Sequence, residues 1–238
     1  MIAIKDKWAL VTGASRGIGK EIAIALGNLG CNIVLHSRSA DHTQALAEQL
    51  NGNGVRTVSL AADLADPGQV EILLSQLNNT APQIDILYNN AAIMTPYHDD
   101  IWSIPADEFR KSFETNVISQ IRLCNALIPS MMARRWGRVI NLISGINEQP
   151  QLAPYATSKA ALKKFTADFV PILKDSGVAM NCLDPGWLRT DMGSQQAPNS
   201  VDSVIPGALV PALLSHCISG KEFCAQDYAG MTIAQALE

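Results

Sequence analysis

Tyr155 and Lys159 stand four positions apart, a spacing that places both side chains on one face of a helix. A phenol with a pKa of about 10 exchanges protons poorly at neutral pH, but a neighbouring ammonium stabilises the phenolate and lowers that pKa. Such a pair could carry general acid–base chemistry on a substrate oxygen. The spacing occurs by chance in many helices, so the surrounding residues must decide. Ser144, which follows an apolar run, is a candidate hydroxyl for the same site.

A glycine-rich turn near the start of the chain reads Thr12-Gly13-Ala14-Ser15-Arg16-Gly17-Ile18-Gly19. It follows one apolar run and opens an amphipathic stretch, so it would join a first strand to a first helix. Glycines let the backbone approach a pyrophosphate, and the free N–H groups of a helix N-terminus bind anions. The spacing is neither the G-x-G-x-x-G fingerprint nor a P-loop. A purely structural turn is the alternative interpretation.

The end of the next apolar run indicates which nucleotide would bind. It reads Val34-Leu35-His36-Ser37-Arg38, with no acid before Asp41. Sites for NAD usually place an acid here, against the 2′-hydroxyl of the ribose. Arg38 and Arg16 could instead meet a 2′-phosphate, which a guanidinium group matches well. The pattern favours NADP(H), the alternative being that Arg38 is only a solvated loop charge.

Short apolar runs alternate with longer helix-like stretches along the chain. The runs are apolar nearly throughout, which is typical of strands buried on both faces of a parallel sheet. The expected strands are 8–12, 32–35, 55–60, 84–88, 139–143, 178–183 and 221–224. The expected helices are 17–29, 40–50, 67–77, 106–134 with an interruption near Pro129, and 155–174.

This alternation predicts an α/β fold built on one doubly wound, parallel, Rossmann-like sheet with right-handed crossovers. The chain has no linker rich in Pro, Gly or Ser and no internal repeat, so residues 1–238 are expected to form a single domain. The segment 191–206 is rich in Gln, Ser, Pro and Asn. We expect it to be a mobile lid over the substrate.

The composition excludes several other classes of protein. The 238 residues are 47% hydrophobic and 17% charged, with a net charge of −4, so the chain should fold and has no electrostatic reason to bind nucleic acid. No run approaches the roughly 18 apolar residues of a membrane span, and the start of the chain lacks the order of a secretory signal. We therefore expect no membrane contact and a cytoplasmic location.

The cysteines are Cys31, Cys124, Cys182, Cys217 and Cys224. No two of them have C-x-x-C spacing, and no two of the four histidines have the spacing of a ligand pair. We expect reduced thiols and no metal site.

In combination, these motifs resemble those of the classical short-chain dehydrogenase/reductase family over nearly the whole chain. The matching pieces are, in order, Thr12-Gly13 with Gly17 and Gly19, Asp63-Leu64, Asn89-Asn90-Ala91-Ala92, Asn116, the run 137–141 leading to Ser144, Tyr155 with Lys159, and the run 185–190. The resemblance implies an oxidoreductase that interconverts a small carbonyl compound and its alcohol with NADP(H).

The resemblance also implies a role for each matching residue. Tyr155 would be the general acid, and Lys159 would lower its pKa and hold the nicotinamide ribose. Ser144 would hydrogen-bond the substrate oxygen, and Asn116 would hold a water in the proton relay. The cofactor would meet Gly13, Ser15, Arg16, Gly17, Ile18, Gly19, Ser37, Arg38, Asp63, Leu64, Asn90, Ala91, Tyr155, Lys159, Pro185, Gly186, Leu188 and Thr190.

Two positions depart from the family pattern. Ala92 stands where the family usually has a glycine, which implies mild crowding by one methyl group. Ser144 lies only eleven residues before Tyr155, so the intervening loop, 145–154, is shorter than usual. Because that loop would line the substrate pocket, the placement of Ser144 depends on it.

The remaining pocket walls are expected from 95–102, Trp187 and 191–206. They offer apolar surface, including Met192, and no Lys or Arg is expected to point inward, which favours a neutral carbonyl compound over a strongly anionic one. For Trp102 and Met192, ordinary core packing is the alternative. The run Arg134-Arg135-Trp136 is expected to be a solvated helix end rather than a docking surface for an acidic carrier protein.

Other interpretations of function remain open. The chain could bind NADP(H) without turnover, as a sensor or scaffold, although the intact set of Asn116, Ser144, Tyr155 and Lys159 favours an enzyme. A sugar-nucleotide epimerase is disfavoured because little chain follows Pro185. The resemblance also implies a homotetramer or homodimer paired through 106–134 and 155–174, and both stretches carry more apolar residues than one buried stripe requires.

Overall fold

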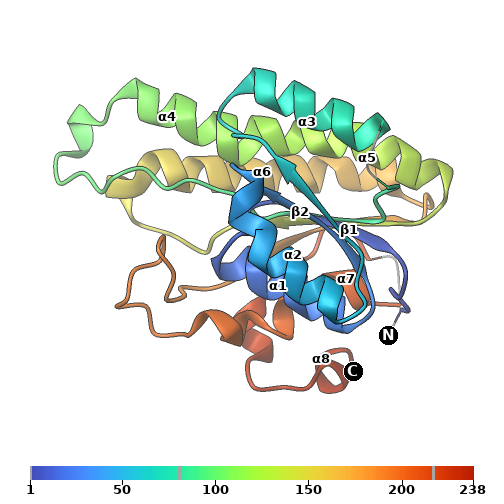
Figure 1. Cartoon of the computed structure of the whole chain (residues 1–238). Helices are drawn as coiled ribbons and strands as arrows, with labels where there is room; N and C mark the ends of the chain where they lie inside the picture. The colour runs from blue at the N-terminus through green and yellow to red at the C-terminus, as the bar shows by residue number, and fades with distance from the viewer. Residues whose placement is uncertain (1, 80–81, 216–217) are drawn as a thin grey trace.

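Seven parallel strands form the centre of the molecule (Figure 1). The computed structural model describes residues 2–79, 82–215 and 218–238. The strands are β1 (Trp8–Val11), β2 (Asn32–Ser37), β3 (Thr57–Ala61), β4 (Ile86–Asn89), β5 (Gly137–Leu142), β6 (Val178–Asp184) and β7 (Glu222–Cys224). They lie in the order β3-β2-β1-β4-β5-β6-β7, and every neighbouring pair is parallel. This confirms the Rossmann-like α/β fold that the alternation of elements predicts.

Helices cover both faces of this sheet (Figure 1). One face carries α3 (Pro67–Asn79), α4 (Ala106–Phe113), α5 (Ser119–Ala133) and α6 (Ala153–Leu173). The other face carries α1 (Gly17–Asn28), α2 (Gln44–Gly52) and α7 (Val210–Leu213), and the short helix α8 (Ile233–Ala236) packs on the same side. The expected helix 40–50 is divided, because its first turn is a 3₁₀ turn over Ala40–Thr43.

Alternate residues of each strand face opposite sides of the sheet. Ala9 and Val11 of β1 pack in the core beneath α1 and α2, whereas Leu10 between them packs in the core beneath α3 and α5. In β2, Leu35 and Val34 divide between the two cores in the same way. Both faces are therefore apolar, which explains why the strands show no polar alternation in the sequence.

The long helix expected over 106–134 is interrupted at a different place from the one predicted. A π-helical turn, Glu114–Ile118, separates α4 from α5, and Pro129 lies inside α5 without breaking it. Pro129 has no N–H to donate to the carbonyl of Asn125, four residues earlier in the helix. Both residues are exposed, so water can replace this missing hydrogen bond. The prediction of an interruption near Pro129 was therefore wrong.

The segment 191–206 is tied back onto the loop that follows β6. Arg189 donates from Nη1 to the carbonyl oxygens of Ala197, at 3.0 Å, and Pro198, at 2.8 Å. Leu188 pairs with Asn199 in a parallel bridge, and Val201–Val204 forms a 3₁₀ turn. Across the described part of the chain, no helix has the length and apolar character to cross a membrane.

Candidate active site

The strand order reverses between β1 and β4, which are neighbours in the sheet although β2 and β3 separate them in sequence. In open α/β sheets, ligands bind at such a switch point, beyond the carboxyl ends of the strands. Because all strands are parallel, the loops that follow β1, β4, β5 and β6 leave from this one edge. These four loops, with the starts of the helices that follow them, carry most of the expected site residues.

The glycine-rich turn leaves an open helix N-terminus at this edge. Gly13 and Gly17 have left-handed φ values of +66° and +55°, and a Cβ on Gly19 would lie 2.4 Å from the carbonyl oxygen of Gly13. Residues with a Cβ would therefore be strained or would collide with the backbone at these positions of the turn. No side chain caps the first turn of α1, so its N–H groups are free to bind an anion. Ser15 and Ile18 are half-buried within the same turn.

Thr12 and Asn90 clamp this turn to the end of β4. The Thr12 hydroxyl accepts from the N–H groups of Asn90, at 2.9 Å, and Ala91, at 3.0 Å, and donates to the Tyr88 carbonyl. In return, the Asn90 amide donates to the carbonyls of Thr12, at 2.7 Å, and Gly13, at 3.3 Å. The structure thus brings together two motifs that lie far apart in the sequence.

His36 is part of the same framework, although the sequence marked it only as a strand residue. Its Nδ1 accepts from the N–H of Gly13 at 3.3 Å, and its Nε2 lies 3.1 Å from the carbonyl oxygen of Ala62. These partners assign the proton to Nε2. Burial lowers the pKa of His36 to about 4, so the ring is neutral and its tautomer is set. His36 therefore links the glycine turn to the end of β3.

The residues expected around the adenosine lie along the ends of β2 and β3. Ser37 is buried and donates to the Ser39 carbonyl, and Arg38 follows it as an exposed side chain. Asp63 is half-buried and accepts from the Ala65 N–H at 2.9 Å, while Leu64 is buried in the core. Arg38 is thus exposed at the carboxyl edge of the sheet, beside β1.

Arg16, the other expected partner of a 2′-phosphate, reaches instead toward the loop after β6. Its Nη1 lies 2.9 Å from the Asp191 carboxylate, and both side chains are about two-thirds exposed at 67% and 69%. An exposed pair of this kind is weak and can exchange partners. The same loop brings Thr190 to the glycine turn, because a Cβ on Gly17 would lie 3.5 Å from the Thr190 methyl group.

The turn between β6 and this loop is held from both sides. The Gly186 N–H donates to Asp184 Oδ1 at 2.9 Å, and the Gln226 amide donates to the Pro185 carbonyl at 2.9 Å. Leu188 is buried in the core below. The four residues expected to flank the nicotinamide, from Pro185 to Thr190, therefore sit on a fixed turn at the site edge.

Tyr155 and Lys159 both project from the start of α6. Lys159 is buried and donates from Nζ to the Leu142 carbonyl, at the end of β5, at 2.7 Å. Its Nζ lies 5.8 Å from the centre of the Tyr155 ring. Burial lowers the pKa of Lys159 to about 8. The predicted arrangement of the pair on one helix face is present.

The pKa of Tyr155 departs from the direction that the sequence suggested. Burial raises it, and the nearby Asp184 carboxylate adds to the rise, while hydrogen bonding by Ser144 acts in the opposite direction. The expectation that Lys159 draws this pKa down toward neutrality fails because Tyr155 is buried as well as paired. Tyr155 is consequently a protonated phenol at neutral pH, which is the form that a proton donor requires.

Asn116 lies in the π-helical turn, where its side chain makes three hydrogen bonds. Its Nδ2 donates to the Ile93 carbonyl and to the Ser158 hydroxyl, both at 2.9 Å, and its Oδ1 accepts from the Ile93 N–H at 2.9 Å. Both amide hydrogens are therefore occupied. The Asn116 side chain thus joins Ile93, in the segment after β4, to Ser158, which lies three residues after Tyr155 on α6. Asn116 therefore helps to position this helix.

The short loop after β5 does not separate Ser144 from Tyr155. Ser144 accepts from the Ile146 N–H at 3.2 Å, and its hydroxyl lies near enough to Tyr155 to act on the pKa of that phenol. The loop is braced by Gln151, whose carbonyl accepts from the His98 N–H at 3.3 Å. Tyr155, Ser144 and Lys159 thus form one cluster at the carboxyl ends of β5 and β6.

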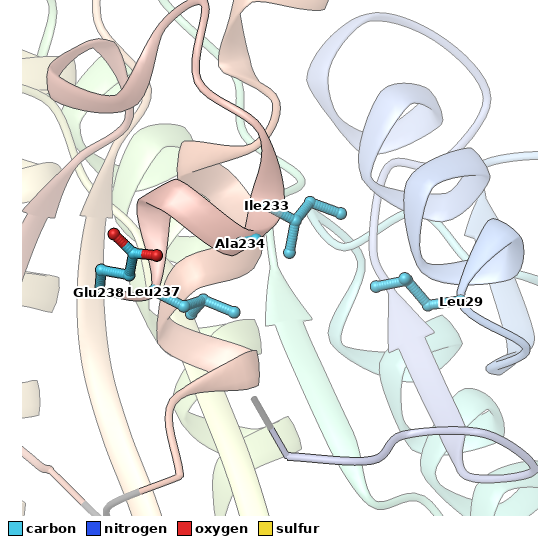
Figure 2. Close-up of a pocket in the computed structure, with 5 residues that line it drawn as sticks. All are labelled: Leu29, Ile233, Ala234, Leu237 and Glu238. Atoms are coloured by element: carbon cyan, nitrogen blue, oxygen red, sulfur yellow. The ribbon is translucent and has the colours of Figure 1, made fainter.

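A shallow apolar groove of about 380 Å³ lies elsewhere, between the C-terminal helix and the end of α1 (Figure 2). Leu29, Ile233 and Leu237 line it, with Glu238 at its rim. Leu29 follows the last turn of α1, whereas the glycine turn opens the first turn of that helix. The groove is therefore remote from the glycine turn and from the residues around Tyr155, so it is a poor candidate for the active site.

The basic run after α5 also lies away from the site. Arg134 donates to the Ile84 carbonyl at 2.7 Å and lies 3.8 Å from Asp85, both before the start of β4. Arg135 donates to the Asp175 carbonyl at 3.0 Å. The run is therefore at the opposite edge of the sheet, where Arg135 is exposed as expected of a solvated helix end, whereas Arg134 is half-buried.

Metal ligands and cysteines add nothing to the site within the part of the chain that the structure describes. No group of three or more His, Cys, Asp or Glu side chains there could hold a metal ion. Cys31, Cys124, Cys182 and Cys224 are free thiols, and Cys217 lies outside the described residues.

A model of the short chain dehydrogenase family matches residues 7–200. The chain therefore belongs to the short-chain dehydrogenase/reductase family, a class of oxidoreductases. Among curated proteins, the 3-oxoacyl-(acyl-carrier-protein) reductase FabG of Pseudomonas aeruginosa is 32% identical over 211 residues, which cover 87% of this chain and 84% of that protein.

Two solved structures illustrate the likeness in fold. A gluconate 5-dehydrogenase from Burkholderia cenocepacia, in complex with NADP and tartrate, superposes with a TM-score of 0.82 at 24% identity, covering 98% of this chain and 96% of that one. A 3-oxoacyl-(acyl-carrier-protein) reductase from Brucella melitensis, with bound NAD, gives a TM-score of 0.82 at 26% identity, covering 93% and 90%. These relatives differ in both substrate and nucleotide.

Proposed function

We propose that the protein is an NADP(H)-dependent reductase of a small carbonyl compound, which can also run as an alcohol dehydrogenase. The observation that carries this proposal is the cluster of Tyr155, Ser144 and Lys159 beside an open helix N-terminus at the switch point of the sheet. Tyr155 is the general acid in reduction and the general base in oxidation.

The chain's residues fit a dinucleotide. The uncapped N–H groups of α1 suit a pyrophosphate, and Gly13 and Gly19 leave room for one to approach. Thr190 at the glycine turn and Pro185 to Leu188 beyond it would flank the nicotinamide end, and Asp63 with Leu64 the adenine end. When bound, the reduced nicotinamide supplies the hydride that adds to the carbonyl carbon.

The protein supplies the proton and holds the oxygen. Negative charge grows on the carbonyl oxygen as its carbon is reduced, so a donor must act there in the transition state. Tyr155 gives its phenolic proton to that oxygen, and the Ser144 hydroxyl stabilises the developing charge. Lys159, buried beside them, restores charge balance when Tyr155 becomes a phenolate and would hold the nicotinamide ribose. Asn116 fixes α6 and would hold a water of the proton relay.

The preference for NADP(H) over NAD(H) rests on two arginines. Arg38 is exposed at the end of β2, where no carboxylate is present to bind a 2′-hydroxyl. The Arg16 side chain forms an exposed ion pair with Asp191, which is weak enough to let it turn to a 2′-phosphate. Since relatives of known structure hold NADP in one case and NAD in another, these residues carry the argument.

A sensor or scaffold without turnover is the alternative, and one assay separates it from an enzyme. Purified protein is mixed with NADPH and a panel of ketones and aldehydes, and the loss of nicotinamide absorbance is followed. The proposal expects turnover with at least one neutral ketone and none with Tyr155→Phe. Tight NADPH binding without turnover across the panel would support the sensor.

Three further properties belong to the same proposal. Ile118 and Ile172, 43% and 61% exposed, lie on the outer side of the π turn and α6, and would be buried in a homodimer or homotetramer. Light scattering at micromolar concentration tests that assembly.

The segment 191–206 would act as a lid of the single catalytic domain. Buried free thiols such as Cys31 and Cys124 suit a reducing, cytoplasmic location.

A further inference from the structure

Asp184 places a carboxylate beside the reacting groups. It is the last residue of β6, and its Oδ1 accepts from the Gly186 N–H at 2.9 Å, which fixes the side chain. A Cβ on Gly145 would lie 2.5 Å from its Oδ2. The second oxygen therefore lies directly against the residue that follows Ser144. Only glycine at 145 leaves room for it.

This carboxylate is not sealed inside the protein. Asp184 is half-buried, and Gly145 beside it is exposed. The charge of Asp184 also reaches Tyr155, whose pKa it helps to raise. A substrate carbonyl placed between Tyr155 and Ser144 would therefore have Asp184 as a close neighbour on the open side of the site.

In the loops expected to border the site, carboxylates outnumber cationic side chains, although Asp191 is paired with Arg16 and the Lys159 ammonium is buried next to Tyr155. The segments 90–105, 143–153 and 184–206 contain six carboxylates and one guanidinium. The carboxylates are Asp99, Asp100, Glu148, Asp184, Asp191 and Asp202. The guanidinium, Arg189, is directed to the carbonyls of Ala197 and Pro198. Lys163, on the adjoining helix, is paired with Glu222 at 2.5 Å.

The same loops expose large aromatic side chains. Trp102 is 90% exposed, and Tyr97 and Trp187 are 57% and 56% exposed. Core packing, the alternative considered for Trp102, is therefore wrong. Exposed apolar side chains that gather around a site offer contact surface to an apolar ligand. The loops expected to border the site thus carry exposed aromatic side chains and more carboxylates than cations.

We propose that Asp184 is a specificity-determining residue, which makes this enzyme select neutral or cationic apolar ketones and reject anionic ones. The inference rests on the proposed function and adds the charge and polarity of the substrate. A substrate carboxylate near the carbonyl would meet the like charge of Asp184, and a negatively charged carrier protein would meet loops in which carboxylates outnumber cations. The substrates of the relatives named above, gluconate and a carrier-bound acyl group, are therefore disfavoured.

A matched series of three ketones tests this. Acetophenone is neutral, 4-acetylbenzoate is anionic and (4-acetylphenyl)trimethylammonium is cationic, and all three share the same reacting carbonyl. In the wild type, kcat/KM with NADPH should be lowest for the anionic ketone. Asp184→Asn, which keeps the shape and removes the charge, should raise the anionic-to-neutral ratio of kcat/KM about tenfold. The cationic-to-neutral ratio should fall.

The control variant is Asp168→Asn, which removes the same charge from the exposed outer side of α6, where Asp168 pairs with Lys164. It should leave both ratios as they are in the wild type. Dissociation constants of the three ketones, measured with the NADP⁺-bound protein, give the same ratios without turnover. If the wild type reduces none of the three ketones, the proposed reductase function is wrong for aryl ketones. The ratios of their dissociation constants still test the role of Asp184 in that case.

Three outcomes would overturn the inference itself. The first is equal preference for the anionic and neutral ketones in the wild type, and the second is that Asp184→Asn leaves the ratios unchanged. The third is failure of all three ketones to bind at millimolar concentration, which would show that the site does not take such ligands.

Discussion

The ammonium of Lys159 donates a 2.7 Å hydrogen bond to the carbonyl oxygen of Leu142, two residues before Ser144. This bond joins α6 to the end of β5, and so holds Tyr155, one turn earlier on α6, against the Ser144 hydroxyl. Lys159 is buried, and its charge is provided where a phenolate would form. The proposed acid–base pair therefore depends on the contact between a helix and a strand as well as on the helix spacing.

Removing the Lys159 ammonium should stabilise the fold while it destroys the activity. Because burial lowers the pKa of Lys159 from 10.5 to about 8, the unfolded chain binds more protons than the folded one between these values. The free energy of unfolding should then rise with pH across this range, and below it the full cost of the buried charge is present. Lys159→Met should raise the unfolding free energy near pH 7 by about 1–3 kcal/mol, less whatever the lost bond to Leu142 costs.

Urea unfolding of both proteins near neutral pH and near pH 10 measures this effect. The increase in unfolding free energy caused by Lys159→Met should be smaller at the higher pH, where the Lys159 amine of the folded wild type is already neutral. A Lys159→Met variant that is less stable than the wild type at both values would contradict the account of Lys159.

Cofactor choice should follow Arg38. Arg38→Asp replaces the proposed partner of the 2′-phosphate with an acid that can bind a 2′-hydroxyl instead. NADPH affinity should fall by roughly 10- to 150-fold, the usual effect of losing a charge-assisted hydrogen bond, and NADH affinity should rise. Fluorescence titration with both nucleotides measures the change. The NADP(H) assignment is wrong if the unmodified protein binds the two equally well.

His36 should control cofactor affinity without touching the chemistry. His36→Phe removes the acceptor for the Gly13 N–H and the donor to the Ala62 carbonyl, so the glycine turn loses its link to β3. The KM for NADPH should rise about tenfold or more, as for the loss of a buried hydrogen-bond partner, while kcat at saturating NADPH changes little.

A matched variant separates this role from simple destabilisation. In His36→Asn, the amide oxygen can occupy the place of Nδ1 and accept from Gly13. Much of the NADPH affinity should return, even if stability does not. If Phe and Asn variants of equal stability show the same KM, His36 does not position the turn.

The strands of the sheet could be predicted from the sequence because burial on both faces makes nearly all of their residues apolar. Both faces of β1 and β2 are covered, so residues such as Leu10, Val34 and Leu35 are all apolar and mark strands without ambiguity. The glycine turn, Tyr155 and Lys159 were equally visible, since their chemistry demands particular residue types at fixed spacing. Helix ends were predicted less accurately, since the expected helix 40–50 is a 3₁₀ turn followed by α2, which ends at Gly52.

The features that the sequence missed depend on contacts between distant segments. The π turn around Asn116 is stabilised by bonds to Ile93 and Ser158, neither of which a local pattern can pair with it. His36 and Asp184 look like ordinary strand residues until the fold sets them against Gly13 and Gly145. The direction of the Tyr155 pKa was mistaken for the same reason, because burial cannot be read from a four-residue spacing.

The most direct test of the account is the turnover of Tyr155→Phe. The substitution keeps the ring and removes only the phenolic hydroxyl, and with it the proton to be donated, so NADPH affinity should remain close to that of the wild type. The rate of the chemical step, measured by single-turnover oxidation of bound NADPH with a ketone that the wild type reduces, should fall by about 10²–10⁴-fold. Lys159→Ala should instead lower both the rate and NADPH affinity. A Tyr155→Phe variant that retains more than about a tenth of the wild-type rate, with chemistry rate-limiting, would show that another group protonates the substrate.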